Sequence, residues 1–302
     1  MTAHRMCRAA GLAALVVMAG CSRETTRVSG GDNLTHILLS DAPFPFDRIA
    51  RADMYIVSVS ASITADTGAG TSFVTLVEPH RRYNLLELQN GTTADLGSLH
   101  LAAGPITAVR VIVDTDSSSI TLKDGRVLTG VSNPGIAWQS SAGRPVLYAL
   151  VHEQLVVPDT GAVIAIDFEL GESFIPGSND GFVFSPILRA VDASRTGSVA
   201  GVVRSANGAP VADASLTLYI VTQATPENTW GDLQTGRTDA SGAFTIPFVT
   251  PSAHWATTGW GPTSQYMLAV DPPSGSGLAR AVLPVGTVEM LRRVDGGTIT
   301  LP

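Results

Sequence analysis

Aromatic side chains gather in one polar stretch toward the carboxyl end of the sequence. Trp230, Trp255 and Trp260 lie close together, and Tyr266 follows them, all among Gly, Thr, Ser and Pro. Aromatic faces with polar neighbours stack on sugar rings or on a protein partner, since they offer contact area at a low entropic cost. These four residues are therefore a candidate ligand-binding surface. The alternative is that the rings fill the end of a β-sandwich beneath a long loop.

Three aspartates give a weak candidate for a metal site. Asp114 and Asp116 begin a segment with the spacing of a calcium loop, and Asp124 follows at a turn. An EF-hand needs Gly at loop position six and Glu at position twelve, but Ser119 and Gly125 stand there. A different calcium site built from the three aspartates is the alternative; solvated acids at a turn are the favoured interpretation.

The sequence lacks the common catalytic motifs. It has no Gly-x-Ser-x-Gly elbow and no phosphate-binding loop. No two of the 6 histidines lie at metal-ligand spacing, and His152-Glu153 is followed by Val156 where a zinc protease needs its second His. We therefore expect a protein that is not an enzyme and needs no cofactor.

We expect structural roles for three charged residues. Asp41 precedes Ala and Pro, so we expect it to cap a turn through its own backbone, with a buried acid or a ligand as the alternative. Arg110 lies on an alternating strand and Asp167 lies beside Phe168. These two residues are a candidate internal ion pair.

The amino terminus has the pattern of a signal peptide, residues 1–20. Arg5 and Arg8 precede a small and apolar run, residues 9–20, which is too short to span about 30 Å of hydrocarbon as a helix. The run ends in Met-Ala-Gly before Cys21, which resembles a bacterial lipobox. The resemblance implies that Cys21 is acylated and becomes the first residue of the mature chain. The alternative is an ordinary signal peptide with an incidental cysteine.

Beyond the cysteine, residues 21–33 are polar and contain a Gly pair, so we expect a lipidated tether. Ser22 follows the cysteine where some sorting signals carry Asp. The resemblance to Gram-negative sorting signals implies the outer membrane, with the chain held in the cell envelope by its lipid.

The composition favours strands over helices and argues against binding to nucleic acid. Charged residues make up only 15% of the 302 residues, and Lys123 is the only lysine, while Gly (30) and Pro (18) are plentiful. Such a chain forms short strands joined by turns more readily than long surface helices. The net charge is -7, and the sequence lacks the basic stripe that a nucleic-acid-binding protein needs.

Alternating apolar residues predict an all-β body over residues 34–193. Residues 54–64 and 105–114 alternate with a period of two, which is typical of strands with one wet face, formed in the first case by serines. Asp124-Gly125 predicts a hairpin turn. Further strands are expected at residues 146–157, 162–168 and 182–191, and residues 84–101 have room for a short helical turn.

A second all-β body is predicted over residues 197–302. Strands are expected at residues 198–204, 214–222, 265–270, 278–283 and 298–301. Turns are expected at Asn207-Gly208 and between Asp239 and Gly242. The fold class is therefore all-β, with two consecutive β-sandwich-like domains after the signal peptide.

The second body resembles the carboxypeptidase regulatory-like family, a prealbumin-type β-sandwich. The residues that carry the resemblance are Gly201, Gly208, Pro210-Val211, Ala214, Thr238-Asp239, Gly242, Phe244 and the segment Tyr266–Val270. The resemblance implies turning glycines and packing side chains, and it implies no reaction.

The first body resembles a bacterial lipoprotein domain, the domain of unknown function 4382. The matching segments follow in the family's order: residues 39–43 (Leu-Ser-Asp-Ala-Pro), 85–91, 103–104, 109–111, 167–168 and 186–189. The resemblance covers about residues 37–192 and implies an architecture without an activity.

Together these observations predict a membrane-anchored envelope lipoprotein. Its expected function is that of a binding or adhesion module for a carbohydrate or a protein of the envelope. The alternative is a structural spacer or scaffold in an envelope assembly.

Overall fold

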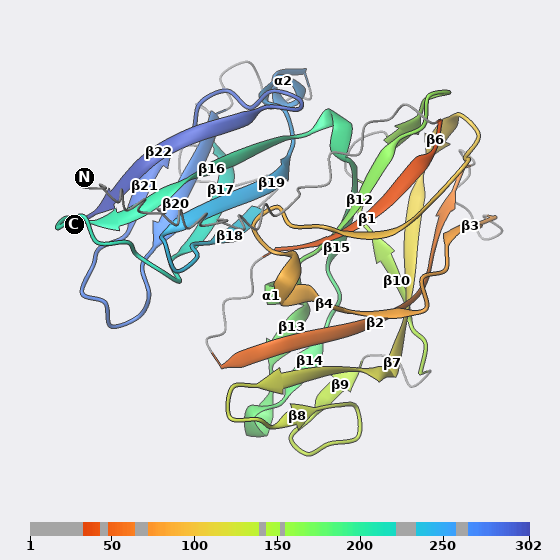
Figure 1. The fold of residues 1–302 in the computed structure, drawn as a ribbon, viewed down its shortest axis with the longest axis horizontal. Helices are drawn as coiled ribbons and strands as arrows, with labels where there is room; N and C mark the ends of the chain where they lie inside the picture. The colour runs from red at the N-terminus through yellow and green to blue at the C-terminus, as the bar shows by residue number, and fades with distance from the viewer. Residues whose placement is uncertain are drawn as a thin grey trace, which may run out of the picture.

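The computed structural model describes residues 33–42, 48–63, 72–138, 143–151, 155–221, 234–257 and 265–302. Nearly all regular structure in these residues is β, which confirms the predicted all-β class. Figure 1 shows two β bodies next to each other along the long axis of the molecule. We call the elements from Thr35 to Asp192 the first body and those from Gly197 to Leu301 the second body.

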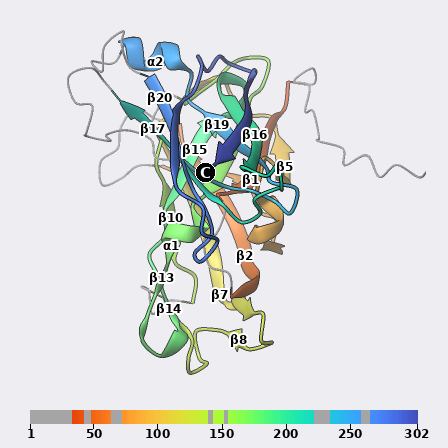
Figure 2. The same ribbon diagram turned by 90° about the vertical axis from the view of Figure 1, so that its left-hand side faces the viewer.

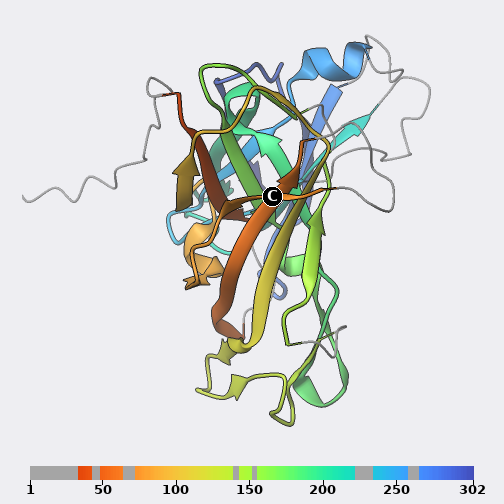
Figure 3. The same ribbon diagram turned by 90° about the vertical axis from the view of Figure 1, so that its right-hand side faces the viewer.

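Two larger sheets form most of the first body. One is mixed, and its strands lie in the order β15 (Leu188–Asp192), β12 (Val163–Phe168), β1 (Thr35–Asp41) and β5 (Ala94–Leu99). The other has the order β10 (Val146–Ala149), β7 (Ala108–Leu122), β2 (Ile49–Ser62) and β3 (Val74–Val77), with β4 (Arg81–Asn84) on β2 and β8 (Val127–Leu128) on β7. Figure 3 shows β2 in orange beside β7 in yellow and β10 in green.

Small elements complete the first body. Two further sheets are β11 (Leu155–Val157) with β6 (Gly104–Ile106), and β13 (Phe174–Pro176), β14 (Phe182–Phe184) and β9 (Ile136–Trp138). The helical segments are η1 (Leu85–Leu88), α1 (Leu170–Ser173), η2 (Ser178–Asp180) and η3 (Ala193–Arg195). Each is at most one turn long, as the scarcity of good helix formers predicts.

The two larger sheets share one apolar core. In β7 the alternate residues Val109, Val111 and Val113 are fully buried in it, which confirms the predicted alternation. Strand β1 was not predicted, since its run shows no alternation. Nearly all its residues are buried on both faces, so it lacks the wet face that would produce a period of two.

Other strands differ from prediction for local reasons. The predicted strand 182–191 is divided into β14 and β15, and Pro186, which lacks a backbone donor, lies between them. The predicted strand 146–157 is likewise divided into β10 and β11. Within residues 84–101 the helical turn is confined to η1, and β5 follows it.

The second body has two sheets. One has the order β19 (Ala243–Val249), β16 (Gly197–Ser205) and β22 (Arg293–Leu301), and the other has β18 (Gln234–Arg237), β17 (Ser215–Val221), β20 (Gln265–Asp271) and β21 (Ala281–Pro284), with α2 at Ser252–Thr257. Their inward residues form a second apolar cluster, separate from the first. The domain boundaries 34–193 and 197–302 remain a prediction.

A predicted turn shows why glycine is needed in the second body. Gly242 donates its N–H to the carbonyl of Asp239 at 2.9 Å and has a φ of +78°. A Cβ at Gly242 would lie 2.4 Å from the carbonyl oxygen of Val203. Only glycine allows both this backbone conformation and this close approach.

The connection between the bodies is short and ordered. Asp192 accepts a hydrogen bond from the N–H of Ser194 at 2.9 Å, and Thr196 accepts one from the N–H of Leu291 at 2.7 Å. Strand β1 ends at the junction, whereas β22 runs parallel to β16 and away from it. The start of β1 and Pro302 therefore lie at opposite ends of the molecule, and Figure 2 views it from the Pro302 end.

Candidate functional site

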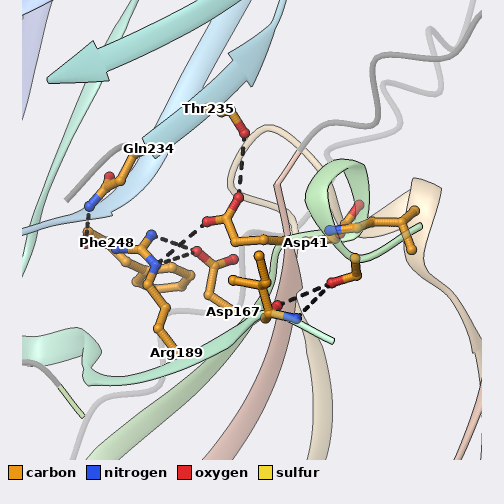
Figure 4. Close-up of polar contacts among 10 residues, drawn as sticks. Asp41, Asp167, Arg189, Gln234, Thr235 and Phe248 are labelled. Carbon is orange, nitrogen blue, oxygen red and sulfur yellow. Dashed lines mark hydrogen bonds and ion pairs between the residues drawn. The ribbon is translucent and has the colours of Figure 1, made fainter. Parts of the chain in front are cut away.

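A buried ion pair lies where β12 and β15 face the second body. Asp167 and Arg189 are opposite each other in the antiparallel register of these strands, and Figure 4 shows their side chains meeting at the junction. Nε and Nη2 of Arg189 donate to Oδ2 of Asp167 at 2.9 and 2.5 Å. Only 7% of Arg189 and 2% of Asp167 is exposed. Either charge alone would be desolvated without compensation, so each depends on the other.

Two more acids lie beside this pair. Oε1 of Glu169 is 3.9 Å from Nε of Arg189. Asp41 accepts hydrogen bonds from the N–H of Leu170 and from Nε2 of Gln89, both at 3.2 Å. The prediction that Asp41 caps its own turn is therefore wrong, because its carboxyl group is buried and bonded to distant parts of the chain. The Arg189 guanidinium therefore lies beside two carboxyl groups, those of Asp167 and Glu169, and Asp41 is a third buried acid in the cluster.

Burial raises the pKa of both additional acids. Desolvation raises the pKa of Glu169 to about 8; the carboxylate of Asp167 adds to the rise and Arg189 opposes it. Burial also holds the pKa of Asp41 well above its usual value, although its hydrogen bonds act to lower it. At neutral pH Glu169 is therefore mostly protonated, which leaves the Asp167 carboxylate and the Arg189 guanidinium as a balanced pair.

The cluster also contacts the second body. Nη1 of Arg189 donates to the carbonyl of Phe248 at 3.4 Å, and the hydroxyl of Thr235 donates to Oε2 of Glu169 at 3.5 Å. Phe248 has a φ of 55°, an uncommon conformation that persists only where its surroundings hold it. A further contact runs from the N–H of Thr245 to Oδ1 of Asn90 at 3.4 Å. These contacts reach β18 and β19, the edge strands of the two sheets of the second body.

Polar atoms around the junction are not all paired. Within the part of the chain that the structure describes, Ser40 Oγ, Asp167 Oδ1 and Gln234 Oε1 are buried without a hydrogen-bond partner. Buried unpaired acceptors are uncommon and costly. The cluster therefore keeps buried acceptors without donors, and it links the two bodies through Arg189 and Glu169.

Glu169 and Arg189 were not among the predicted site residues. Their signal is present in the sequence, since Arg189 is a charged residue within an apolar strand and Glu169 directly follows one. The predicted pair of Arg110 with Asp167 is wrong, because Arg189 is directly opposite Asp167 on the neighbouring strand.

Two of the four predicted stacking residues lie inside the second body. Only 9% of Trp255 and 2% of Tyr266 is exposed. Nε1 of Trp255 donates to the hydroxyl of Tyr266 at 2.8 Å, and that hydroxyl donates to the carbonyl of Thr250 at 2.8 Å. These two rings pack in the core and present no face to a ligand. Trp230 and Trp260 lie outside the described residues.

The three aspartates do not form a metal site. Asp114 accepts a hydrogen bond from Nε of Arg144 at 3.2 Å, and Asp124 accepts one from Nε of Arg126 at 2.8 Å. Among the described residues no group of three His, Cys, Asp or Glu side chains is placed to hold a metal ion. Two of the three carboxylates of the weak candidate Asp114, Asp116 and Asp124 are thus paired with arginines. Asp124 does belong to the predicted hairpin turn, in which Gly125 has a φ of +87°.

A second feature lies on the outer face of the sheet that contains β2. The predicted wet face is covered there, since only 2% of Ser60 is exposed. Nε of Arg110 donates to Oγ of Ser60 at 2.8 Å, and Cζ of Arg110 lies 4.1 Å from the ring centroid of Phe73. Tyr148 is opposite Arg110 in the register, and its ring centroid is 6.3 Å from that of Phe73. We call Phe73, Arg110 and Tyr148 the aromatic–arginine platform.

Comparisons place the first body in a family. The model of the family described as domain of unknown function (DUF4382) matches residues 35–186. No curated protein sequence matches the chain. No helix among the described residues is long and apolar enough to cross a membrane.

Similar solved structures share only low identity and low TM-scores. The minor pilin GBS52 of Streptococcus agalactiae is 11% identical, with 88% of this chain and 95% of that chain covered at a TM-score of 0.23. A putative adhesin of Bacteroides ovatus is 10% identical, with 89% and 92% covered at a TM-score of 0.24. A 9R-lipoxygenase of Cyanothece is 19% identical, with 37% of this chain covered at a TM-score of 0.25. The chain spans only 17% of that lipoxygenase and 60% of a 3-chlorocatechol 1,2-dioxygenase of Rhodococcus opacus.

Proposed function

Since the chain belongs to the family described as domain of unknown function 4382, whose description assigns no activity, we propose its function from geometry. The protein is a non-catalytic, lipid-anchored component of the cell envelope that acts as a rigid two-domain arm. The first domain, residues 34–193, lies nearest the anchor and carries the second, residues 197–302. We infer the carboxypeptidase regulatory-like fold for the second domain from the sequence motifs that resemble that family.

The junction is the observation that carries this proposal. Arg189 is bound to Asp167 within the first body and also reaches the carbonyl of Phe248 in the second. The connection between β15 and β16 is only η3 and its neighbours, which rules out a long flexible linker in this segment. The start of β1 and the end of β22 lie at opposite ends of the molecule. An anchored chain with this arrangement would hold its carboxyl end away from the membrane.

Lipid attachment is expected at Cys21 and not at Cys7. Cells that express the full chain and grow with an alkyne-tagged fatty acid should label the protein, and Cys21→Ser should abolish the label. Cys7→Ser is the matched control, since Cys7 lies in the segment expected to be removed. A label that survives Cys21→Ser, or that Cys7→Ser removes, would refute the anchor. Fractionation of the labelled cells tests the outer membrane as its location.

A rigid arm should give one narrow distance between its ends. Ser98 lies near the start of β1 and Ala206 at the far end of β16, and both are exposed. Spin labels at Ser98→Cys and Ala206→Cys, in a chain whose Cys7 and Cys21 are Ser, report this distance by pulsed electron–electron double resonance. Arg189→Met should broaden the distribution, whereas Arg280→Met, at a surface ion pair with Asp271, should not. A broad distribution in the parent chain would contradict rigidity.

Binding or adhesion is the second candidate function. The tryptophan-rich surface offers less support than expected, since Trp255 and Tyr266 are buried. The aromatic–arginine platform favours binding independently, because Tyr148 remains 61% exposed. Trp230 and Trp260 stay candidates for binding a glycan or an envelope protein.

A further inference from the structure

The aromatic–arginine platform combines a fixed cation with an exposed ring. The guanidinium of Arg110 lies on the face of Phe73, and its Nε is engaged by Ser60. A hydrogen bond and a cation–π contact together hold the side chain in one orientation. The planar group is therefore preorganised, so that ligand binding would cost little conformational entropy at this side chain.

The charge of Arg110 has no neutralising partner within the part of the chain that the structure describes. Among the described residues no carboxylate forms an ion pair with Arg110, whereas Arg144 and Arg189 are each paired with an aspartate. Only Nε is used in hydrogen bonding there, so both Nη atoms keep donors for an acceptor from outside. A carboxylate, like a phosphate, matches the geometry of such a planar fork.

The neighbouring surface is apolar and open. Tyr148 is 61% exposed, and on the same edge strand Val146 is 42% exposed. Figure 3 shows that this strand, β10, lies at the side of its sheet, next to β7. The platform consists of three residues, whereas a stable protein interface involves about 20–30 residues on each side. So few residues suit a ring-sized ligand.

We propose that the platform binds an acidic saccharide, with the ring of a uronic acid on Tyr148 and its carboxylate on Arg110. The proposal deepens the second candidate function, since it names the class of ligand and its site. Charge complementarity carries it, because an unneutralised guanidinium beside an exposed aromatic ring matches a sugar ring that bears a carboxylate.

The test measures binding of trigalacturonic acid by titration calorimetry with the full chain in detergent. Its methyl ester, which lacks the charge, is the matched probe. Near 0.15 M salt the net negative charge of the protein is screened beyond about 8 Å, so the readout reports the local contact. Trigalacturonic acid should bind, and the ester should bind about tenfold more weakly or worse.

Two variants and one matched control locate the site. Arg110→Met and Tyr148→Leu should each weaken binding of trigalacturonic acid by about tenfold or more. Arg81→Met is the control, because Arg81 also lies over an aromatic ring, that of Tyr83, on another strand. It should leave the affinity within about twofold. Circular dichroism checks that each variant is folded.

Three results would overturn the proposal: no binding of trigalacturonic acid, equal binding of acid and ester, or undiminished binding by Arg110→Met. Equal binding of hexaglutamate, with the same dependence on Arg110, would also overturn it in favour of an acidic protein ligand. Lipid labelling and the distance measurement do not involve the platform. Failure of the saccharide proposal would therefore leave the proposal of a rigid anchored arm intact. Failure of the arm proposal would likewise leave the saccharide proposal intact.

Discussion

Arg189→Met should lower the free energy of unfolding by about 3–5 kcal/mol, the usual cost of removing one partner from a buried ion pair. The substitution leaves the buried carboxyl groups of Asp167 and Glu169 without their cation. Asp167 must then either stay charged in a buried place or take up a proton, and both outcomes disfavour the folded state. Urea titration at pH 7 measures the change.

The same cluster predicts an asymmetry between the two partners. Asp167→Asn should cost less than Arg189→Met, because Glu169, 3.9 Å from Arg189, can ionise and replace the lost charge. Arg280→Met serves as the control, since its ion pair with Asp271 is largely exposed and should contribute at most about 1 kcal/mol. An Arg189→Met protein no less stable than Arg280→Met would show that the cluster does not hold the junction.

Stability should fall as the pH rises from about 5 to about 8. The pKa of Glu169 is raised from 4.5 to about 8 in the folded protein. Between these values the folded chain keeps a proton that the unfolded chain has lost, so the free energy of unfolding decreases with pH. One such group contributes a slope of up to about 1.4 kcal/mol per pH unit. The raised pKa of Asp41 acts in the same direction.

The charges that face Glu169 set this behaviour. Asp167 and Glu172 favour its protonation, and Arg189 opposes it. Glu169→Gln should flatten the pH dependence and make the protein more stable than its parent at pH 8. Glu172→Gln is the matched control, an exposed acid three residues away that should leave most of the slope. The measurement is the thermal unfolding temperature from pH 5 to pH 8. A rise in stability toward pH 8 would contradict the prediction.

Strands with one buried face could be predicted from the sequence, because burial of every second residue leaves a period of two. Strand β7 is the clear case. Strand β1 could not be found this way, since both its faces are covered by parts of the chain far away in sequence. Local turn chemistry was also readable, as Gly125 and Gly242 adopt the left-handed conformations expected of them.

The candidate site was less accessible to sequence reasoning. Asp41, Asp167 and Arg189 all belong to segments that carry the family resemblance, but their meeting depends on strand register, which spacing does not encode. Exposure was the other obstacle. Trp255 lies among small and polar residues and is buried, whereas Tyr148 lies in an apolar run and is exposed, so the neighbours of an aromatic residue in the sequence do not indicate its exposure.

The contacts at β19 also bear on solubility. This strand lies at the edge of its sheet, and the first body engages two of its backbone groups, the N–H of Thr245 and the carbonyl of Phe248. An uncovered edge is a template for pairing with another chain. We therefore expect the first body to protect this edge from pairing with another chain, and a second body released by cleavage at residue 196 to self-associate through β19.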